Sequence, residues 1–185
     1  MAPRPDVAQA ERLLREAGVR TLRLTLHYPT GRDTTAEDAV LFAPLVDAGL
    51  VELSHVELPA EEYRQRERHG RLGLYRAGWI ADYLDADSFL YFLLHSSAQT
   101  VYPLGYRNAE LDKLLSEARV SVDPELRYQL YRRAEKLLSV DCPVIPLYHE
   151  RLYALTTAAT QGMRLHQTPP QVRFESLWLD PEVED

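Results

Sequence analysis

The order of helix-like and strand-like patterns in the first 78 residues restricts the fold of this chain more than any other feature. Three segments typical of helices alternate with three segments typical of strands. The helical segments are residues 6–17, 34–48 and 59–69, and the strand segments are 22–26, 50–58 and 72–78. Strands separated by helices favour a parallel or mixed sheet with helices packed on its faces. The sequence therefore predicts an α/β fold with a mixed sheet flanked by helices.

Local signals mark the ends of these helices. Asp6 with Gln9, and Thr34 with Glu37, have the spacing of a capping box, in which the first side chain accepts a hydrogen bond from the backbone three positions later. The first two helices end at glycines, which readily adopt the left-handed backbone conformation found there. In the second strand we expect Val56 to point into the core.

The second half of the chain is mainly helical. Three helices are predicted, over residues 87–95, 108–118 and 123–139. Asn108 and Asp123 stand at their N-cap positions, and a polar and aromatic loop covers 96–107. From residue 143 onward the chain has the pattern of strands or extended segments. The single cysteine, Cys142, is expected to be a small buried residue beside them.

Composition and charge limit the partners of the protein. The chain has 185 residues and a formal net charge of -7. Nucleic-acid binding normally needs a basic surface, so we expect no nucleic-acid partner. No apolar run approaches the roughly 18 residues that span a bilayer, which predicts no transmembrane segment. Residues 1–6 lack the apolar region of a secretory signal peptide, and the sequence leaves open whether Met1 is the native start.

No pattern in the sequence points to catalysis or to metal binding. The six histidines are scattered, without the i, i+4 pairs that zinc sites on helices use. Asp82, Asp85 and Asp87 lie close together, but they lack the glycine and terminal glutamate of a calcium loop. Phosphate-binding loops and nucleophile elbows are also missing. We therefore predict a protein that is not an enzyme and that carries no metal and no other cofactor.

The order of several short motifs is more specific than any one of them. Residues 78–83 read Gly-Trp-Ile-Ala-Asp-Tyr, and residues 85–89 read Asp-Ala-Asp-Ser-Phe. Tyr-Arg-Asn follows at 106–108, and Cys-Pro-Val-Ile-Pro-Leu-Tyr at 142–148. In this order the motifs resemble the C-terminal half of family 5 extracellular solute-binding proteins, such as the dipeptide and oligopeptide receptors. The resemblance runs from about residue 6 to residue 179.

The resemblance implies a fold and a division of the chain. Members of this family are bilobal clamps that close on a ligand between the lobes. The expected fold is a periplasmic-binding-protein-like (type II) lobe, with residues 6–145 as the C-terminal lobe. Residues 146–179 are then extended segments that return toward an absent first lobe, and 180–185 form a frayed acidic tail. The missing N-terminal lobe, or another polypeptide, is an implied partner.

The resemblance also implies a ligand site. Asp82 matches the position that anchors the free α-amino group of a bound peptide, and Trp79 and Tyr83 flank it. In the family, the loop that carries Tyr102 and Tyr106 borders the cleft. The residues alone also allow structural roles: Asp82 as a turn cap, and Trp79 as a core residue.

Two functions follow from the resemblance. The first is a substrate-binding component of an ABC transporter that takes a peptide or other small solute and works with a permease, in the periplasm or cell envelope. The second is a cytoplasmic ligand-sensing or interaction domain, related to the solute-binding lobe of some transcription regulators. The lack of a signal peptide leaves a cytoplasmic location open, and the ligand and the oligomeric state stay undetermined.

Overall fold

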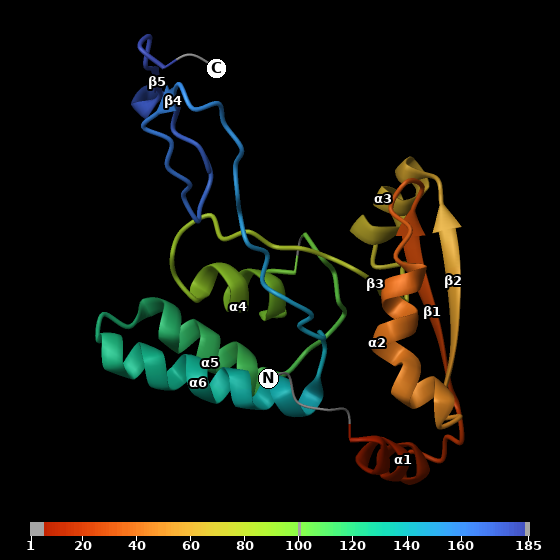
Figure 1. Ribbon diagram of the computed structural model, residues 1–185. Coiled ribbons are helices and arrows are strands. Elements are labelled where there is room, and N and C mark those ends of the chain that lie inside the picture. The colour runs from red at the N-terminus through yellow and green to blue at the C-terminus, as the bar shows by residue number, and fades with distance from the viewer. Residues whose placement is uncertain (1–5, 100, 184–185) are drawn as a thin grey trace. The chain divides into compact units, whose positions relative to one another are not determined.

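The computed structural model describes residues 6–99 and 101–183, and Figure 1 shows its path. The chain divides after Ala77 into two units. Unit 1 ends at Ala77, and unit 2 begins at Gly78. The predicted segment boundaries at residues 145 and 179 are a different division of the chain and stay predictions. The predicted acidic tail, 180–185, lies partly outside the described residues.

Unit 1 alternates helices and strands, as the sequence predicts. Its elements are α1 (Val7–Glu16), β1 (Leu22–Pro29), α2 (Thr35–Asp47), β2 (Val51–Leu58), α3 (Ala60–Arg68) and β3 (Leu74–Tyr75). The sheet has the order β2-β1-β3, with β1 parallel to both neighbours. Parallel strands need crossover connections, and here helices supply them. The α/β class is confirmed, although β3 is much shorter than the predicted strand 72–78.

One residue of β2 points to the other side than expected. Val51 is buried, and Leu53 and His55 on the same face are half-buried, whereas Val56 is exposed. Strand side chains alternate between the two faces, so Val51 and Val56 cannot point the same way in a regular strand. On the face of Val51, the His55 ring contacts the buried carboxylate of Asp38. The expectation for Val56 is therefore wrong.

The start of α2 also differs from the prediction. Asp6 does cap α1, since its carboxylate accepts a hydrogen bond from the backbone N–H of Gln9. Thr34 makes no such bond at α2. Its hydroxyl instead donates to Asp38 across 2.7 Å, and Asp33 accepts from the backbone of Thr35. The capping box at Thr34 is wrong because the buried Asp38 uses the threonine hydroxyl.

Unit 2 is built on three helices, α4 (Asp87–Leu94), α5 (Ala109–Val120) and α6 (Pro124–Asp141). The predicted caps are confirmed, because Asn108 and Asp123 each accept two backbone N–H bonds from the first turn. Helices α5 and α6 pack side by side, as Figure 1 shows. The core that they share with α4 consists of Leu94, Leu111, Leu114, Leu115, Ala118, Leu130, Tyr131 and Ala134. Dense apolar burial of this kind makes the hairpin the best-packed part of unit 2.

The end of the chain contains little regular structure. Two short strands, β4 (Thr160–Gln161) and β5 (Trp178–Leu179), pair antiparallel, and η1 (Phe174–Ser176) precedes β5. Cys142 is exposed and adopts the left-handed conformation at the end of α6. The expectation of a buried cysteine is wrong, since this position is where the backbone leaves the helix. Among the described residues, none of the helices has both the length and the apolar character to cross a membrane.

Candidate functional site

The predicted anchor, Asp82, lies in a loop whose C-terminal end is fixed by α4. We call residues 78–86 the Asp82 loop. The backbone N–H of Asp82 donates to the hydroxyl of Ser88 across 3.2 Å, and Ser88 is fully buried in α4. Within the loop, the N–H of Asp85 donates to the carbonyl of Tyr83. The backbone at Asp82 is therefore tied to a buried side chain.

The three aspartates of this region have different surroundings. Asp85 accepts hydrogen bonds from the backbone N–H of Asp87, at 2.8 Å, and from the guanidinium of Arg127, at 2.9 Å. Asp87 is 5% exposed, accepts the Tyr83 hydroxyl, and lies 3.8 Å from the Arg119 guanidinium. Asp82 is exposed. No described residue donates to its carboxylate or pairs with it, so among the three aspartates the Asp82 carboxylate is the one that is both exposed and unpaired.

Arg127 connects the Asp82 loop to the helical hairpin. Besides Asp85, it donates from Nε to the carbonyl of Ala118 at 3.0 Å and from a terminal nitrogen to the Tyr131 hydroxyl at 3.1 Å. The hydrogen bonds to Tyr131 and Asp85 raise the pKa of Arg127. The guanidinium thus remains charged and is held by groups from three segments of unit 2.

The aromatic residues predicted for the site fall into two groups. The Trp79 and Tyr102 rings meet edge to face, with centroids 6.4 Å apart, and the Tyr102 hydroxyl donates to the carbonyl of Gly78. The Trp79 indole nitrogen is buried and has no hydrogen-bond partner among the described residues. An edge-to-face pair of this kind forms a rigid apolar surface at the start of the Asp82 loop.

The other two aromatic residues are bonded to carboxylates of unit 2. Tyr83 donates to Asp87, and Tyr106 donates to Asp141 at 2.5 Å. Burial, followed by these hydrogen bonds, raises the pKa of each phenol to about 12. The structure therefore brings Trp79 and Tyr102 together and engages the hydroxyls of Tyr83 and Tyr106 internally. The ligand-binding role of all five residues stays a prediction.

A serine-histidine-aspartate arrangement, which the sequence analysis missed, lies at the end of α4. His95 contacts the Ser116 hydroxyl through Nε2 at 3.1 Å, and its Nδ1 lies 3.9 Å from Asp112. However, Nδ1 accepts the backbone N–H of Ser97 at 3.1 Å. A neutral ring then carries its proton on Nε2 and donates to Ser116, whereas a catalytic base must accept the serine proton there. This geometry describes a structural link between α4 and α5.

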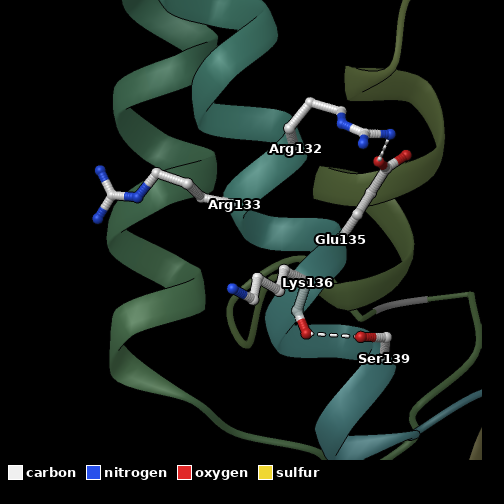
Figure 2. A pocket seen from close by; sticks show the side chains of 5 residues that line it. All are labelled: Arg132, Arg133, Glu135, Lys136 and Ser139. Carbon is white, nitrogen blue, oxygen red and sulfur yellow. Dashed lines mark hydrogen bonds and ion pairs between the residues drawn. The ribbon is translucent and has the colours of Figure 1, made fainter.

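A hollow of ≈ 520 Å³ lies on α6. The side chains that line it are those of Arg132, Arg133, Glu135, Lys136 and Ser139 (Figure 2). Arg132 lies 3.7 Å from Glu135, and the Ser139 hydroxyl donates to the carbonyl of Lys136. The hollow contains none of the five predicted site residues, and exposed, flexible side chains from a single helix form its lining. We therefore place the candidate site at the Asp82 loop. Within the described residues, no group of three histidine, cysteine or carboxylate side chains could hold a metal.

Comparison with known proteins gives the family context. No protein-family model matches the chain. It is 33% identical over 148 residues to the periplasmic oligopeptide-binding protein OppA of Haemophilus influenzae, which covers 76% of the chain and 27% of OppA. It is 30% identical over 177 residues to the probable deoxycholate-binding periplasmic protein YgiS of Escherichia coli, covering 94% of the chain and 32% of YgiS.

Among solved structures, the dipeptide-binding protein of Pseudoalteromonas sp. SM9913 in complex with Met-Leu superposes with a TM-score of 0.78, at 24% identity. That match covers 94% of the chain and 35% of the dipeptide-binding protein. The fold is therefore that of periplasmic-binding-protein-like peptide receptors. The chain spans about a third of the length of its relatives. Its homologues are oligopeptide-binding, dipeptide-binding and related family 5 solute-binding proteins, and the homology covers most of its length. These relatives are binding proteins.

Proposed function

We propose that this chain is part of a peptide-binding component of an ABC transporter and that Asp82 binds the free α-amino group of the peptide. The free Asp82 carboxylate carries the proposal. Asp85 and Asp87 are occupied by donors of the protein itself, whereas Asp82 is exposed and has no partner among the described residues. An amine that enters a closing cleft needs a charged acceptor to offset its desolvation.

The aromatic surface beside Asp82 supports the same ligand class. Trp79 and Tyr102 form an apolar edge-to-face pair in the same unit, and such surfaces bury side chains at low entropic cost. YgiS is a probable deoxycholate-binding protein, and deoxycholate is an anion. A free carboxylate repels an anion, so the Asp82 loop favours a ligand with an amine.

The rest of the clamp is part of the proposal. Solute-binding clamps enclose a ligand from two sides, and this chain corresponds to about a third of its relatives. The remaining part supplies the opposite wall of the cleft, and residues 146–179 return toward it. OppA and YgiS are periplasmic proteins. We place this protein in the same compartment, beside a permease.

Nuclear magnetic resonance tests this function and locates the site in one titration. Trp79 and Trp178 are the two tryptophans of the chain, so two indole N–H signals report on well-separated positions in the sequence. Unlabelled tripeptide is added to the ¹⁵N-labelled chain up to millimolar concentration, since a half-cleft binds weakly. We expect the Trp79 indole and the amides of the Asp82 loop to shift while the Trp178 indole stays in place.

The matched control is the same tripeptide with an acetylated N-terminus. Acetylation removes the positive charge and leaves the rest of the peptide unchanged. We define the amine preference as the Kd of the acetylated peptide divided by the Kd of the free peptide. A charge-assisted hydrogen bond gives a preference of about 10 to 100. Equal shifts with both peptides, or shifts confined to other regions, would contradict the proposed function.

A further inference from the structure

We infer that Arg127 is a positioning residue for the ligand site: acting through Asp85, it fixes the loop that presents the Asp82 carboxylate. The inference rests on the proposed function of Asp82. Arg127 lies on α6, far from Asp82 in the sequence, and none of its hydrogen bonds involves Asp82 itself. Its effect on a ligand is therefore indirect.

Asp85 is the connecting group. One of its oxygens, Oδ1, accepts both the backbone N–H of Asp87, at the first residue of α4, and the Arg127 guanidinium. The same carboxylate thus joins the end of the Asp82 loop, the start of α4 and helix α6. Asp85 lies three residues after Asp82, so a displacement of Asp85 changes the direction of the short segment that carries the ligand carboxylate.

Arg127 is a suitable anchor because its other bonds reach the best-packed part of unit 2. The carbonyl of Ala118 belongs to α5, Tyr131 lies one turn further along α6, and Ala118 is fully buried. The planar guanidinium offers donors in a fixed geometry that lysine does not reproduce. The planar guanidinium of Arg127 therefore holds the loop in a fixed position relative to the α5–α6 core.

A second set of contacts holds the same loop. The effect of Arg127 on the loop can therefore be separated from an effect on overall folding. Tyr83 donates to Asp87, which lies 3.8 Å from Arg119. The guanidinium of Arg119 in turn lies 4.1 Å from the centre of the Tyr91 ring. These contacts, together with the bond from Asp82 to Ser88, hold the loop against α4 without Arg127. Loss of Arg127 should then make the orientation of the Asp82 loop less fixed, while unit 2 stays folded.

The test compares Arg127→Met with Arg127→Lys and Arg133→Met in the full chain. Arg133 lies on the same helix, and Figure 2 shows its side chain directed away from Arg132 and Glu135. Arg133→Met therefore removes the same charge without touching the Asp82 loop. We expect Arg127→Met to lower the amine preference for a free over an acetylated tripeptide by about tenfold, in the range of coupling between contacting residues. Arg127→Lys should restore part of it, and Arg133→Met should leave it unchanged.

Hydrogen exchange supplies a second readout that needs no ligand. The Asp82 N–H donates to Ser88, so its exchange rate reports on the order of the loop. It should rise in Arg127→Met and stay at the wild-type value in Arg133→Met. A purely structural role of Arg127 would instead weaken both peptides equally and leave their ratio unchanged.

The outcomes separate the inference from the proposed function. A wild-type chain without amine preference overturns the proposed function, and the inference with it. A wild-type chain that prefers the amine, together with an Arg127→Met chain that keeps the same preference and the same Asp82 exchange rate, overturns the inference alone. A combined Asp85→Asn and Arg127→Met variant should lose no more preference than either change alone, because both act through one contact.

Discussion

Two aspartates, Asp38 in unit 1 and Asp82 in unit 2, show opposite uses of a carboxylate. Asp38 is 1% exposed and accepts hydrogen bonds from Arg76, at 2.9 Å from Nε, and from Thr34, and it contacts His55. Asp82 is exposed and has no such partner among the described residues. A buried charge requires partners because desolvation is costly, whereas an exposed charge can remain free for a ligand. The contrast separates a carboxylate that the fold uses from one that stays free for a ligand.

The charge on Arg76 illustrates how unit 1 satisfies its buried carboxylate. Partial burial alone lowers the pKa of Arg76, but Asp38 and Glu37 raise it by more, so the net direction is upward. Arg76 contacts both carboxylates, and the pair with Asp38 is largely shielded from water. The guanidinium is therefore committed to the folded structure of unit 1.

Breaking the Asp38 network should give the largest effect. Arg76→Met leaves Asp38 buried with only His55 and Thr34 as partners. Removing one partner of a buried ion pair costs about 3–5 kcal/mol. We expect the free energy of unfolding of unit 1, measured by denaturant titration, to fall by about 3 kcal/mol.

The control for this prediction is Arg23→Met. Arg23 pairs with Glu52 at 3.0 Å, but their side chains are 84% and 63% exposed. Exposed pairs contribute about 0–1 kcal/mol, so this variant should be close to wild type. A loss of similar size in both variants would mean that burial does not distinguish the two pairs.

A smaller effect is expected at alkaline pH. Burial and bonding to Asp87 and Asp141 raise the pKa of Tyr83 and Tyr106 to about 12. Because the folded pKa lies above the unfolded value, this contribution to stability is fully present below about pH 10 and is lost as pH rises through about 12. Ultraviolet absorbance of the phenolates should show late titration of these two tyrosines, and Tyr106→Phe should reduce the late absorbance change by the contribution of one phenol.

The same Tyr106→Phe variant also tests the effect of the Tyr106–Asp141 hydrogen bond on the carboxyl group of Asp141. Hydrogen bonds from Tyr106 and Asn108 lower the pKa of Asp141. A lowered carboxyl pKa stabilises the fold above the unfolded pKa, and that contribution is lost as pH falls through the folded value. Removing the phenol should move the pKa of Asp141 upward in an NMR titration. An unchanged pKa would show that the Tyr106 bond does not persist in solution.

The smallest change in stability is expected for Asp82→Asn. The Asp82 side chain has no partner to lose among the described residues, and surface substitutions of this kind usually stay within about 0.5 kcal/mol. Thermal unfolding should therefore match wild type. A clear destabilisation would mean that the carboxylate is a structural cap, which is the other role that the sequence alone allows.

Much of the fold could be predicted because local signals and tertiary structure agree. Asp6, Asn108 and Asp123 cap helices as their spacing indicates, and helix–strand alternation gives the parallel sheet of unit 1. The prediction failed at Thr34 and Val56. The two errors have different causes. At Thr34 the buried Asp38 takes the hydroxyl, which the spacing of a capping box does not reveal. At Val56 the expectation broke the alternation of a regular strand, which places Val51 and Val56 on opposite faces.

The candidate site, like the fold, could be predicted from the sequence only in part. The motif at residues 78–83 indicates Asp82 and Trp79, but nothing in it names Arg127 or Ser88 as the groups that hold the loop. Those contacts depend on how α4 and α6 pack, which residue spacing does not specify. The resemblance to a family predicts Asp82 as the ligand carboxylate, and the structure adds that Asp85 and Asp87 are engaged by groups of the protein whereas Asp82 is not.

Isothermal titration calorimetry of Asp82→Asn beside Asp47→Asn decides whether Asp82 binds the peptide amine. Asp47 is exposed and lies in unit 1, so its substitution removes the same charge away from the site. We expect Asp47→Asn to keep the wild-type amine preference and Asp82→Asn to bring it close to one, by weakening the binding of the free peptide about 10- to 100-fold. An Asp82→Asn chain that still prefers the free amine would show that Asp82 does not bind it.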